Sequence, residues 1–243
     1  MRALLIAFTF LTRIPLPQPQ DVTAEEFARS QRYYPLIGLF LGLVLWGTAT
    51  LVGLWYPPLA IAAILLALEI ILTGGLHLDG FMDSMDGLLS ARTRERMLEI
   101  MKDSRVGAHA SITLAALLIL KFSLLASFSP SSYSFLILPP LLARWAFLIA
   151  VIHFPYARSQ GLGKGFHESS HWLFFILEGV AINAWVFWFF GLAGVSAVLS
   201  ALLFVTFFSW RVARLLGGLT GDIYGATIEI TEVVVLIATV PFL

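Results

Sequence analysis

Three aspartates occur at helical spacing in the segment 77–87, which reads HLDGFMDSMDG. Asp79, Asp83 and Asp86 are four and three residues apart, so on an α-helix their side chains fall within an arc of about 60°. Carboxylate oxygens are the ligands that Mg²⁺ prefers, and the phosphates of a substrate replace waters that remain on the ion. The segment therefore predicts a Mg²⁺ site for a diphosphate, with these three aspartates as metal ligands.

The alternative for the same segment is the solvated end of a helix. Metal binding is favoured because carboxylates so close together repel one another unless a cation compensates their charge. Acidic residues that follow an apolar run are also costly to keep near a membrane, so they need a reason to be there.

A second acidic set occurs in the segment 217–233, which reads GGLTGDIYGATIEITEV. Asp222 precedes an apolar run, and Glu229 and Glu232 lie three apart within it. Such carboxylates can pair with a buried basic residue, relay protons or bind a metal. We expect Asp222 and Glu229 to be further metal ligands, because the glycine-rich turn before the run would place them level with the first cluster.

Two basic residues, Lys121 and Arg144, lie inside apolar runs. They could neutralise the carboxylates that occur in other runs, among them Glu69 and Glu178. For these two glutamates we favour the structural pairing over a role in the site.

Binding of a diphosphate needs cations from the protein as well. Lys102 and Arg105, in the sequence KDSRVG, are the best candidates because Asp103 between them could hold one of them in place. Other candidates for substrate binding are residues that leave room for a phosphate ester near the backbone or lie in the glycine-rich turn before the last apolar run, namely Gly80, Gly87, Thr220 and Gly221.

The proton of an attacking hydroxyl requires an acceptor near the metal. His77 stands beside the aspartates and could ligate or relay a proton. Asp83, His77 and Asp222 are the candidate catalytic residues, and the sequence does not choose between a carboxylate and the imidazole as the general base.

The composition predicts an integral membrane protein. The chain has 243 residues, of which 59% are hydrophobic and only 12% are charged, against about 25% charged residues in soluble domains. Its mean hydropathy is +0.89. The formal net charge is zero, which gives no reason to expect a nucleic-acid partner, and the absence of cysteine excludes disulfides and thiolate metal sites.

An all-α bundle of helices in the lipid bilayer must position these residues. We expect it to be a single domain over 1–243. Runs of about 17 to 25 apolar residues predict about seven transmembrane helices, at 36–56, 58–75, 110–128, 133–153, 172–190, 194–210 and 227–243. The segment 1–11 is too short to span and is expected to be an interfacial or re-entrant helix. Gly38 and Gly42 form a GxxxG pair, which allows close packing within the chain or in a homo-oligomer.

The charges divide the connectors between these runs into two classes. Thirteen of the 15 Lys and Arg residues fall in four long segments, 1–35, 76–109, 154–171 and 211–226, while the other connectors are short and uncharged. By the positive-inside rule the four long segments are cytoplasmic, with the N-terminus inside and the C-terminus outside.

Five segments resemble the cobalamin synthase family, also named adenosylcobinamide-GDP ribazoletransferase. They read FTFLTRIPLP at 8–17, YYPLIGLFLG at 33–42, TGGLHLDGFMDSMDGL at 73–88, EIMKDSRVGAHA at 99–110 and GGLTGDIYGATIEITE at 217–232. The resemblance implies that Asp79, Asp83 and Asp86 are the acidic motif of the family. It also implies that the other polar positions of the family are Lys102, Asp103, Asp222, Glu229 and Glu232.

The resemblance also implies an activity. A magnesium-dependent enzyme of the bacterial cytoplasmic (inner) membrane would join adenosylcobinamide-GDP to α-ribazole, or to its 5′-phosphate, and release GMP. A ribose hydroxyl would attack the phosphorus on the cobinamide side while Mg²⁺ bridges the diphosphate oxygens.

Two other functions compete with this one. A CDP-alcohol phosphotransferase also uses spaced aspartates on membrane helices, and the segment 86–92 imitates the beginning of its motif, but no glycine with two further aspartates follows at the required spacing. A divalent-cation or proton-coupled transporter would place ionisable groups near the middle of the bilayer on broken helices, whereas here most carboxylates gather toward one face.

Overall fold

The fold, described from a computed structural model, covers residues 2–158 and 172–243. Within these residues it is all-α, with no strand beyond an isolated bridge between Tyr156 and Leu219, as the sequence predicts. The helices are α1 (Arg2–Leu11), α2 (Ala24–Ser30), α3 (Tyr34–Val52), α4 (Pro58–Thr73), α5 (Leu76–Leu88), α6 (Arg94–Ile100), α7 (Ala108–Leu125), α8 (Leu138–His153), α10 (Trp172–Leu216) and α11 (Gly221–Thr239). Short 3₁₀ turns occur at η1 (Gln31–Tyr33), η2 (Tyr133–Ile137) and η3 (Val240–Phe242).

Several of these helices could cross a membrane, which supports the prediction of a polytopic membrane protein. Five described segments are long and apolar enough, namely Ala24–Val52, Ala108–Leu125, Tyr133–His153, Phe175–Leu216 and Gly221–Phe242. A sixth results if α4 and α5, which are bent by 91°, form one broken span. The predicted number of about seven is therefore approximate.

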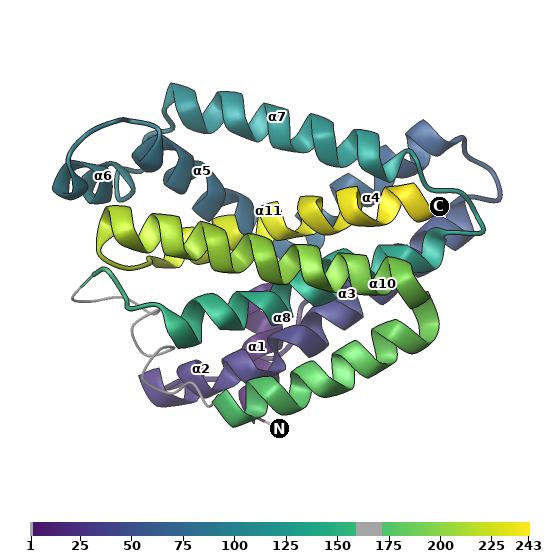
Figure 1. Cartoon of the computed structure of the whole chain (residues 1–243), viewed down its shortest axis with the longest axis horizontal. Coiled ribbons are helices and arrows are strands. Elements are labelled where there is room, and N and C mark those ends of the chain that lie inside the picture. The colour runs from purple at the N-terminus through teal and green to yellow at the C-terminus, as the bar shows by residue number, and fades with distance from the viewer. Residues whose placement is uncertain (1, 159–171) are drawn as a thin grey trace.

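The difference in number comes from α10 and α4. Gly191 has non-helical backbone angles (φ 53°, ψ −134°) and separates the two runs predicted at 172–190 and 194–210. Figure 1 shows α10 reversing its direction at the end opposite to α6, so its two halves lie side by side. The run predicted at 58–75 gives α4, whose 16 residues qualify as a span only together with α5.

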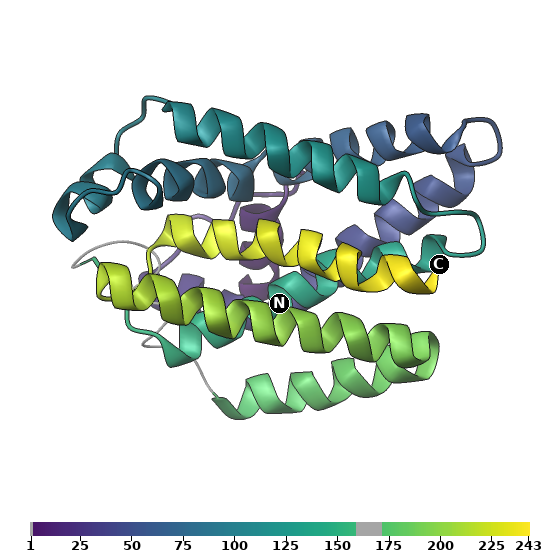
Figure 2. The same ribbon diagram turned by 45° about the horizontal axis from the view of Figure 1, so that its top comes forward.

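The bend between α4 and α5 is made by two glycines. Gly74 and Gly75 have φ angles of 65° and 69°, a left-handed conformation that glycine adopts without steric cost. A side chain at Gly74 would overlap the side chain of Arg13, and the backbone N–H of Arg13 donates to Leu72 O at 2.6 Å. The left-handed backbone of the two glycines turns α5 away from α4, and Figure 2 shows α5 leading toward α6 at the edge of the bundle.

The helix α8 lies at the centre of the bundle, with most of its residues buried. Close packing against α3 explains the GxxxG pair, because a Cβ at Gly42 would lie 2.7 Å from Ile137 Cα and one at Gly38 would overlap Pro140 O. The pair therefore serves packing within the chain.

A network of buried ion pairs crosses the interior. Lys121 Nζ lies 2.9 Å from Glu69, 3.4 Å from Glu229 and 2.5 Å from Glu232, and Arg144 lies 2.5 Å from the other oxygen of Glu232. The predicted pairing of Glu69 is thus confirmed. Glu229 belongs to the same network, which corrects its expected place beside the aspartates.

Three of the four long charged connectors gather at one end of the bundle. In Figure 1 the segment around α6, residues 154–158 after α8 and the turn between α10 and α11 all lie at the left end, whereas the α3–α4 and α7–α8 connections and the C-terminus lie at the right. These three connectors therefore share one end of the bundle, as the charge pattern predicts, whereas α1 of the fourth segment, 1–35, lies near the middle of the bundle in Figure 1.

Candidate active site

The site begins where α5 crosses α11. A Cβ at Gly80 would lie 2.9 Å from Asp222 O, and one at Gly225 would lie 3.1 Å from His77 O. The two backbones approach this closely because both positions lack a side chain. The contact brings Asp79 and Asp222, which are distant in sequence, to the same cavity.

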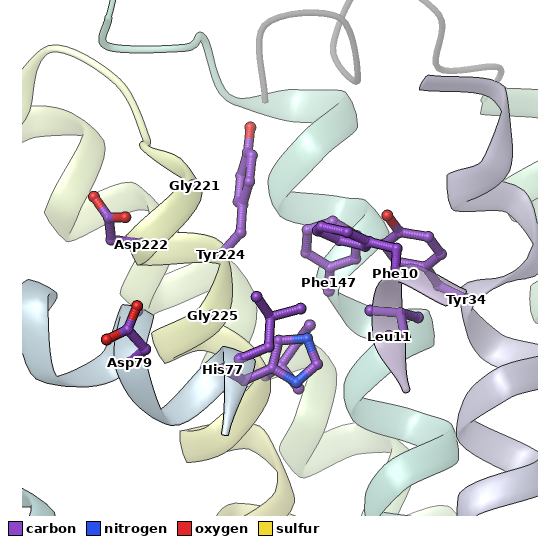
Figure 3. A pocket seen from close by; sticks show the side chains of 13 residues that line it. Phe10, Leu11, Tyr34, His77, Asp79, Phe147, Gly221, Asp222, Tyr224 and Gly225 are labelled. Carbon is purple, nitrogen blue, oxygen red and sulfur yellow. The ribbon is translucent and has the colours of Figure 1, made fainter. Parts of the chain in front are cut away.

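We call this space the inner cavity. It has a volume of about 240 Å³ and lies among α1, α3, α5, α8 and α11. In Figure 3 the carboxylates of Asp79 and Asp222 lie on one side of it and the rings of Phe10, Tyr34 and Phe147 on the other. Its remaining lining residues are Leu11, Leu76, His77, Gly80, Gly221, Tyr224, Gly225 and Ile228.

A second space of about 300 Å³ shares Asp79 with the inner cavity, and we call it the acidic cavity. Asp83 and Asp86 line it together with Lys102 and Arg105. All three aspartates of the first motif therefore face one space, as their helical spacing predicts, and two basic residues face them.

A third, more open space of about 630 Å³ follows, which we call the basic cleft. Arg92, Arg96 and His109 line it, and it shares Asp86 and Arg105 with the acidic cavity. The inner cavity therefore adjoins the acidic cavity, and the acidic cavity adjoins the basic cleft. A ligand with a flat ring, a diphosphate and further anionic groups could lie along them.

Asp86 has a structural partner that the sequence did not indicate. Its two carboxylate oxygens accept hydrogen bonds from the backbone N–H groups of Gly107, at 2.7 Å, and Ala110, at 2.8 Å. These are unpaired donors at the start of α7, so the carboxylate caps that helix. Asp86 therefore joins α5 to α7, which leaves Asp79 and Asp83 as the aspartates of the motif without such a partner among the described residues.

The carboxylates are near one another without forming a finished metal site. The carboxylates of Asp222, Asp79 and Asp86 disfavour a negative charge on Asp83, whereas the guanidinium of Arg158 favours it. Within residues 2–158 and 172–243, no group of three or more acidic or histidine side chains has the geometry to hold a metal ion. The predicted Mg²⁺ ligands stay a prediction.

Arg158 is a site residue that the sequence reasoning missed. Its guanidinium donates to Asp222 Oδ2 at 2.7 Å, and both side chains are largely buried. Hydrogen bonds between Ala157 N and Leu219 O and between Leu219 N and Pro155 O, both 2.8 Å long, hold this loop beside the start of α11. No sequence pattern distinguishes Arg158 from the other arginines of the long connectors. Only its ion pair with Asp222, which depends on the fold, identifies it as a site residue.

The predicted arrangement of Arg105 and Asp103 is confirmed. The guanidinium of Arg105 donates to both oxygens of Asp103, at 2.5 Å and 3.0 Å. These hydrogen bonds lower the pKa of the exposed Asp103 to about 2. Arg105 is thereby held between the acidic cavity and the basic cleft, while Lys102 lines the acidic cavity with an exposed side chain.

Packing accounts for some positions expected to bind substrate. Gly80 lies against α11, and a Cβ at Gly87 would lie 2.5 Å from the Met101 side chain. Thr220 is fully buried, and its hydroxyl accepts from Ile223 N at 3.3 Å to cap α11. Gly221 differs from these, because it is exposed and lines the inner cavity.

Two further predicted residues have different outcomes. His77 lines the inner cavity, is only 5% exposed, and its Nδ1 has no hydrogen-bond partner among the described residues. The pairing predicted for Glu178 with Lys121 or Arg144 is wrong, since its buried Oε2 is likewise without a hydrogen-bond partner in the described chain.

Comparison with known proteins identifies the family. The sequence profile described as cobalamin-5-phosphate synthase matches residues 3–240. The chain belongs to this family. The match covers both acidic segments and nearly the whole bundle, so it confirms the resemblance carried by the five motifs.

Relatives of known name agree with the profile. A protein of Desulfitobacterium hafniense (strain Y51), named adenosylcobinamide-GDP ribazoletransferase, is 56% identical over 100% of this chain and 98% of its own length. Proteins of the same name from Brevibacillus brevis and Pseudomonas aeruginosa are 40% and 41% identical over 99% and 98% of this chain, and over 98% and 97% of their own lengths. No solved structure matches. The family is thus one of transferases in cobalamin biosynthesis, which favours neither the CDP-alcohol phosphotransferase nor the transporter.

Proposed function

We propose that this protein is an adenosylcobinamide-GDP ribazoletransferase that joins its donor to α-ribazole, or to α-ribazole 5′-phosphate, and releases GMP. The observation that carries the proposal is the contact of α5 with α11 at Gly80, which brings Asp79 and Asp222 to one cavity. Relatives named adenosylcobinamide-GDP ribazoletransferase align with essentially the whole of this chain, which also supports the proposal.

Mg²⁺ is the proposed cofactor, and the donor atoms fit it. The ion is commonly bound through one or two carboxylates, with waters and substrate phosphates completing its shell, so a preformed set of three protein ligands is not required. Asp79 and Asp83 form no ion pair among the described residues and face the acidic cavity, so they are the residues we expect to hold it, with Asp86 or Asp222 as further ligands. When bound, Mg²⁺ would neutralise the charge of the diphosphate and of the departing phosphate.

The protein's own residues position and neutralise the reactants. Lys102 and Arg105 face the acidic cavity, where they would bind diphosphate oxygens, and the basic cleft beyond Arg105 would receive the GMP portion. A ribose hydroxyl of the acceptor attacks the phosphorus on the cobinamide side, and the bond from that phosphorus to the GMP oxygen breaks. A carboxylate of α5 or His77 takes the hydroxyl proton.

The location of the site follows from the charge pattern. We propose that the reaction takes place on the cytoplasmic side of the bacterial inner membrane, because the positive-inside rule assigns the long basic connectors to that side, and Lys102 and Arg105 of one of these connectors line the acidic cavity. This leaves the N-terminus inside and the C-terminus outside.

The test is GMP release from adenosylcobinamide-GDP by the purified full-length protein in detergent or proteoliposomes. We expect release to require both α-ribazole and Mg²⁺. Release without an acceptor would indicate a hydrolase, and no release in the presence of all three components would contradict the proposal. Labelling of single cysteines placed in the α5–α6 and α3–α4 connections, from either side of the membrane, tests the orientation in a chain that has no native cysteine.

A further inference from the structure

The aromatic side of the inner cavity has no role in the chemistry of the diphosphate. Phe10, Tyr34 and Phe147 come from α1, α3 and α8, which are three helices that carry none of the acidic residues of the site. Figure 3 shows their rings grouped across the cavity from Asp79 and Asp222. A ligand that contacts both sides must have an apolar flat part and a polar part.

The rings pack against one another in a row. The Tyr34 ring lies 5.8 Å from that of Phe147, at an interplanar angle of 16°, and 6.2 Å from that of Phe10, at 27°. The Tyr224 ring closes the row edge-on against Phe147, at 5.3 Å and 80°. Offset stacking and edge contacts are the arrangements in which aromatic groups attract one another, so a planar aromatic ligand in the cavity could extend this group of rings.

The size of the cavity limits what can enter. Its volume of about 240 Å³ is below the range of about 300–1,000 Å³ that is typical of pockets for drug-sized ligands. One fused ring system with part of a sugar fits such a space, whereas a corrinoid macrocycle does not. The large donor therefore has to approach from the acidic cavity and the basic cleft.

A buried polar atom in the lining also points to a ligand. The side chain of His77 is almost fully buried, and its Nδ1 lacks a hydrogen-bond partner among the described residues. A buried polar group without a partner is costly, and a bound molecule that offers a ring nitrogen or a hydroxyl would remove that cost.

We propose that the inner cavity is the acceptor subsite, in which Phe10, Tyr34 and Phe147 hold the flat base of α-ribazole and direct its ribose toward Asp79 and Asp222. The assignment rests on the proposed function, because it takes the acceptor from that reaction. It makes the aromatic residues determinants of acceptor affinity and gives them no part in binding the donor.

Binding of α-ribazole alone, in the absence of donor and Mg²⁺, tests the assignment by isothermal titration. Phe10→Leu keeps an apolar side chain but removes a ring, and we expect about three- to tenfold weaker binding, the scale of one aromatic pair. Phe204→Leu is the matched control, since Phe204 is also half-buried and stacks on Phe208 at 5.4 Å, outside the cavity. It should bind like the wild type.

A second variant acts by filling the space. Ile228 lines the cavity and is 2% exposed, so Ile228→Phe should occupy the position of the base and abolish the binding of α-ribazole. In turnover, Phe10→Leu should raise KM for the acceptor and leave KM for adenosylcobinamide-GDP unchanged, whereas Ile228→Phe should release no GMP. The melting temperature of each variant in detergent identifies any variant that fails to fold. If one of the two cavity variants is unfolded, the other still tests the assignment.

The outcomes separate this assignment from the proposed function. If the wild type releases GMP but the folded variants bind α-ribazole as the wild type does, or change KM for the donor instead, the acceptor subsite lies elsewhere and the function stands. If the wild type binds α-ribazole in the cavity but never releases GMP, the function fails while the subsite is retained. If a co-purified lipid fills the cavity and α-ribazole does not displace it, the assignment is overturned.

Discussion

Gly80 of α5 lies directly against the backbone of Asp222 at the start of α11, so that even a methyl group at Gly80 would come within 2.9 Å of the Asp222 carbonyl oxygen. The two acidic segments are more than a hundred residues apart in sequence. This one contact determines how far apart their carboxylates lie.

Gly80→Ala should therefore separate α5 from α11. Because the obstructing atoms belong to the backbone, the helices must shift, and we expect a loss of about 1–3 kcal/mol in stability together with a fall in turnover. Thermal unfolding in detergent and GMP release measure the two effects. Gly47→Ala is the control, since nothing lies within 4 Å of a Cβ there. Equal behaviour of the two variants would show that the contact is unimportant.

Asp83→Asn should leave the protein folded and inserted but nearly inactive. Asp83 lines the acidic cavity, and loss of its charge should weaken both the cation and the stabilisation of the departing phosphate, at a cost of about two orders of magnitude in turnover. GMP release at increasing Mg²⁺ concentration gives the result. Glu95→Gln, an exposed change on α6, serves as the control. Full turnover of Asp83→Asn at saturating Mg²⁺ would remove Asp83 from the site.

Arg158→Gln should lower both stability and turnover, because it breaks the ion pair with Asp222. The variant leaves a largely buried carboxylate without its partner, and we expect a loss of about 1.5–3 kcal/mol and reduced turnover. If the pair acts as a unit, the double variant Arg158→Gln with Asp222→Asn should be less destabilised than the sum of the two single variants. Additive losses in a double-mutant cycle would mean that the two residues act independently.

Glu232→Gln should be the most damaging change in the buried network. Glu232 is the residue that bridges Lys121 and Arg144, and removal of one member of a buried charge network typically costs about 3–5 kcal/mol. Glu69→Gln should cost less, because Lys121 keeps two other carboxylates. Melting temperatures of the two variants, with Glu178→Gln as a carboxylate outside the network, test this order.

Asp103→Asn should weaken donor binding without changing the melting temperature. Arg105 holds the pKa of Asp103 at about 2, below its ordinary value, so the pair is ionised at neutral pH and is lost only as the pH falls toward 2. KM for the donor should accordingly rise in the variant, and KM of the wild type should show no pH dependence from Asp103 above about pH 4. Glu25→Gln, which breaks the exposed pair with Arg29, is the matched control. An unchanged donor KM would remove the pair from donor binding.

The sequence by itself determined the class of the protein and the first acidic face. Apolar runs of membrane length require helices, because backbone groups in lipid have no other hydrogen-bond partners. The spacing of Asp79, Asp83 and Asp86 places them on one side of a helix whatever the rest of the fold does. Charge in the connectors likewise predicted one polar end.

Only the tertiary structure decided which carboxylates meet and which are used in packing. Asp222 reaches the first cluster through the glycine contact of α5 with α11, while Glu229 turns to Lys121 and Asp86 caps α7. Arg158 pairs with Asp222 only because its loop bonds to the residue before Thr220. Local spacing fixes the direction of a side chain along its own helix, but the partner of a buried charge depends on which helices cross, and that is set by contacts between distant parts of the chain.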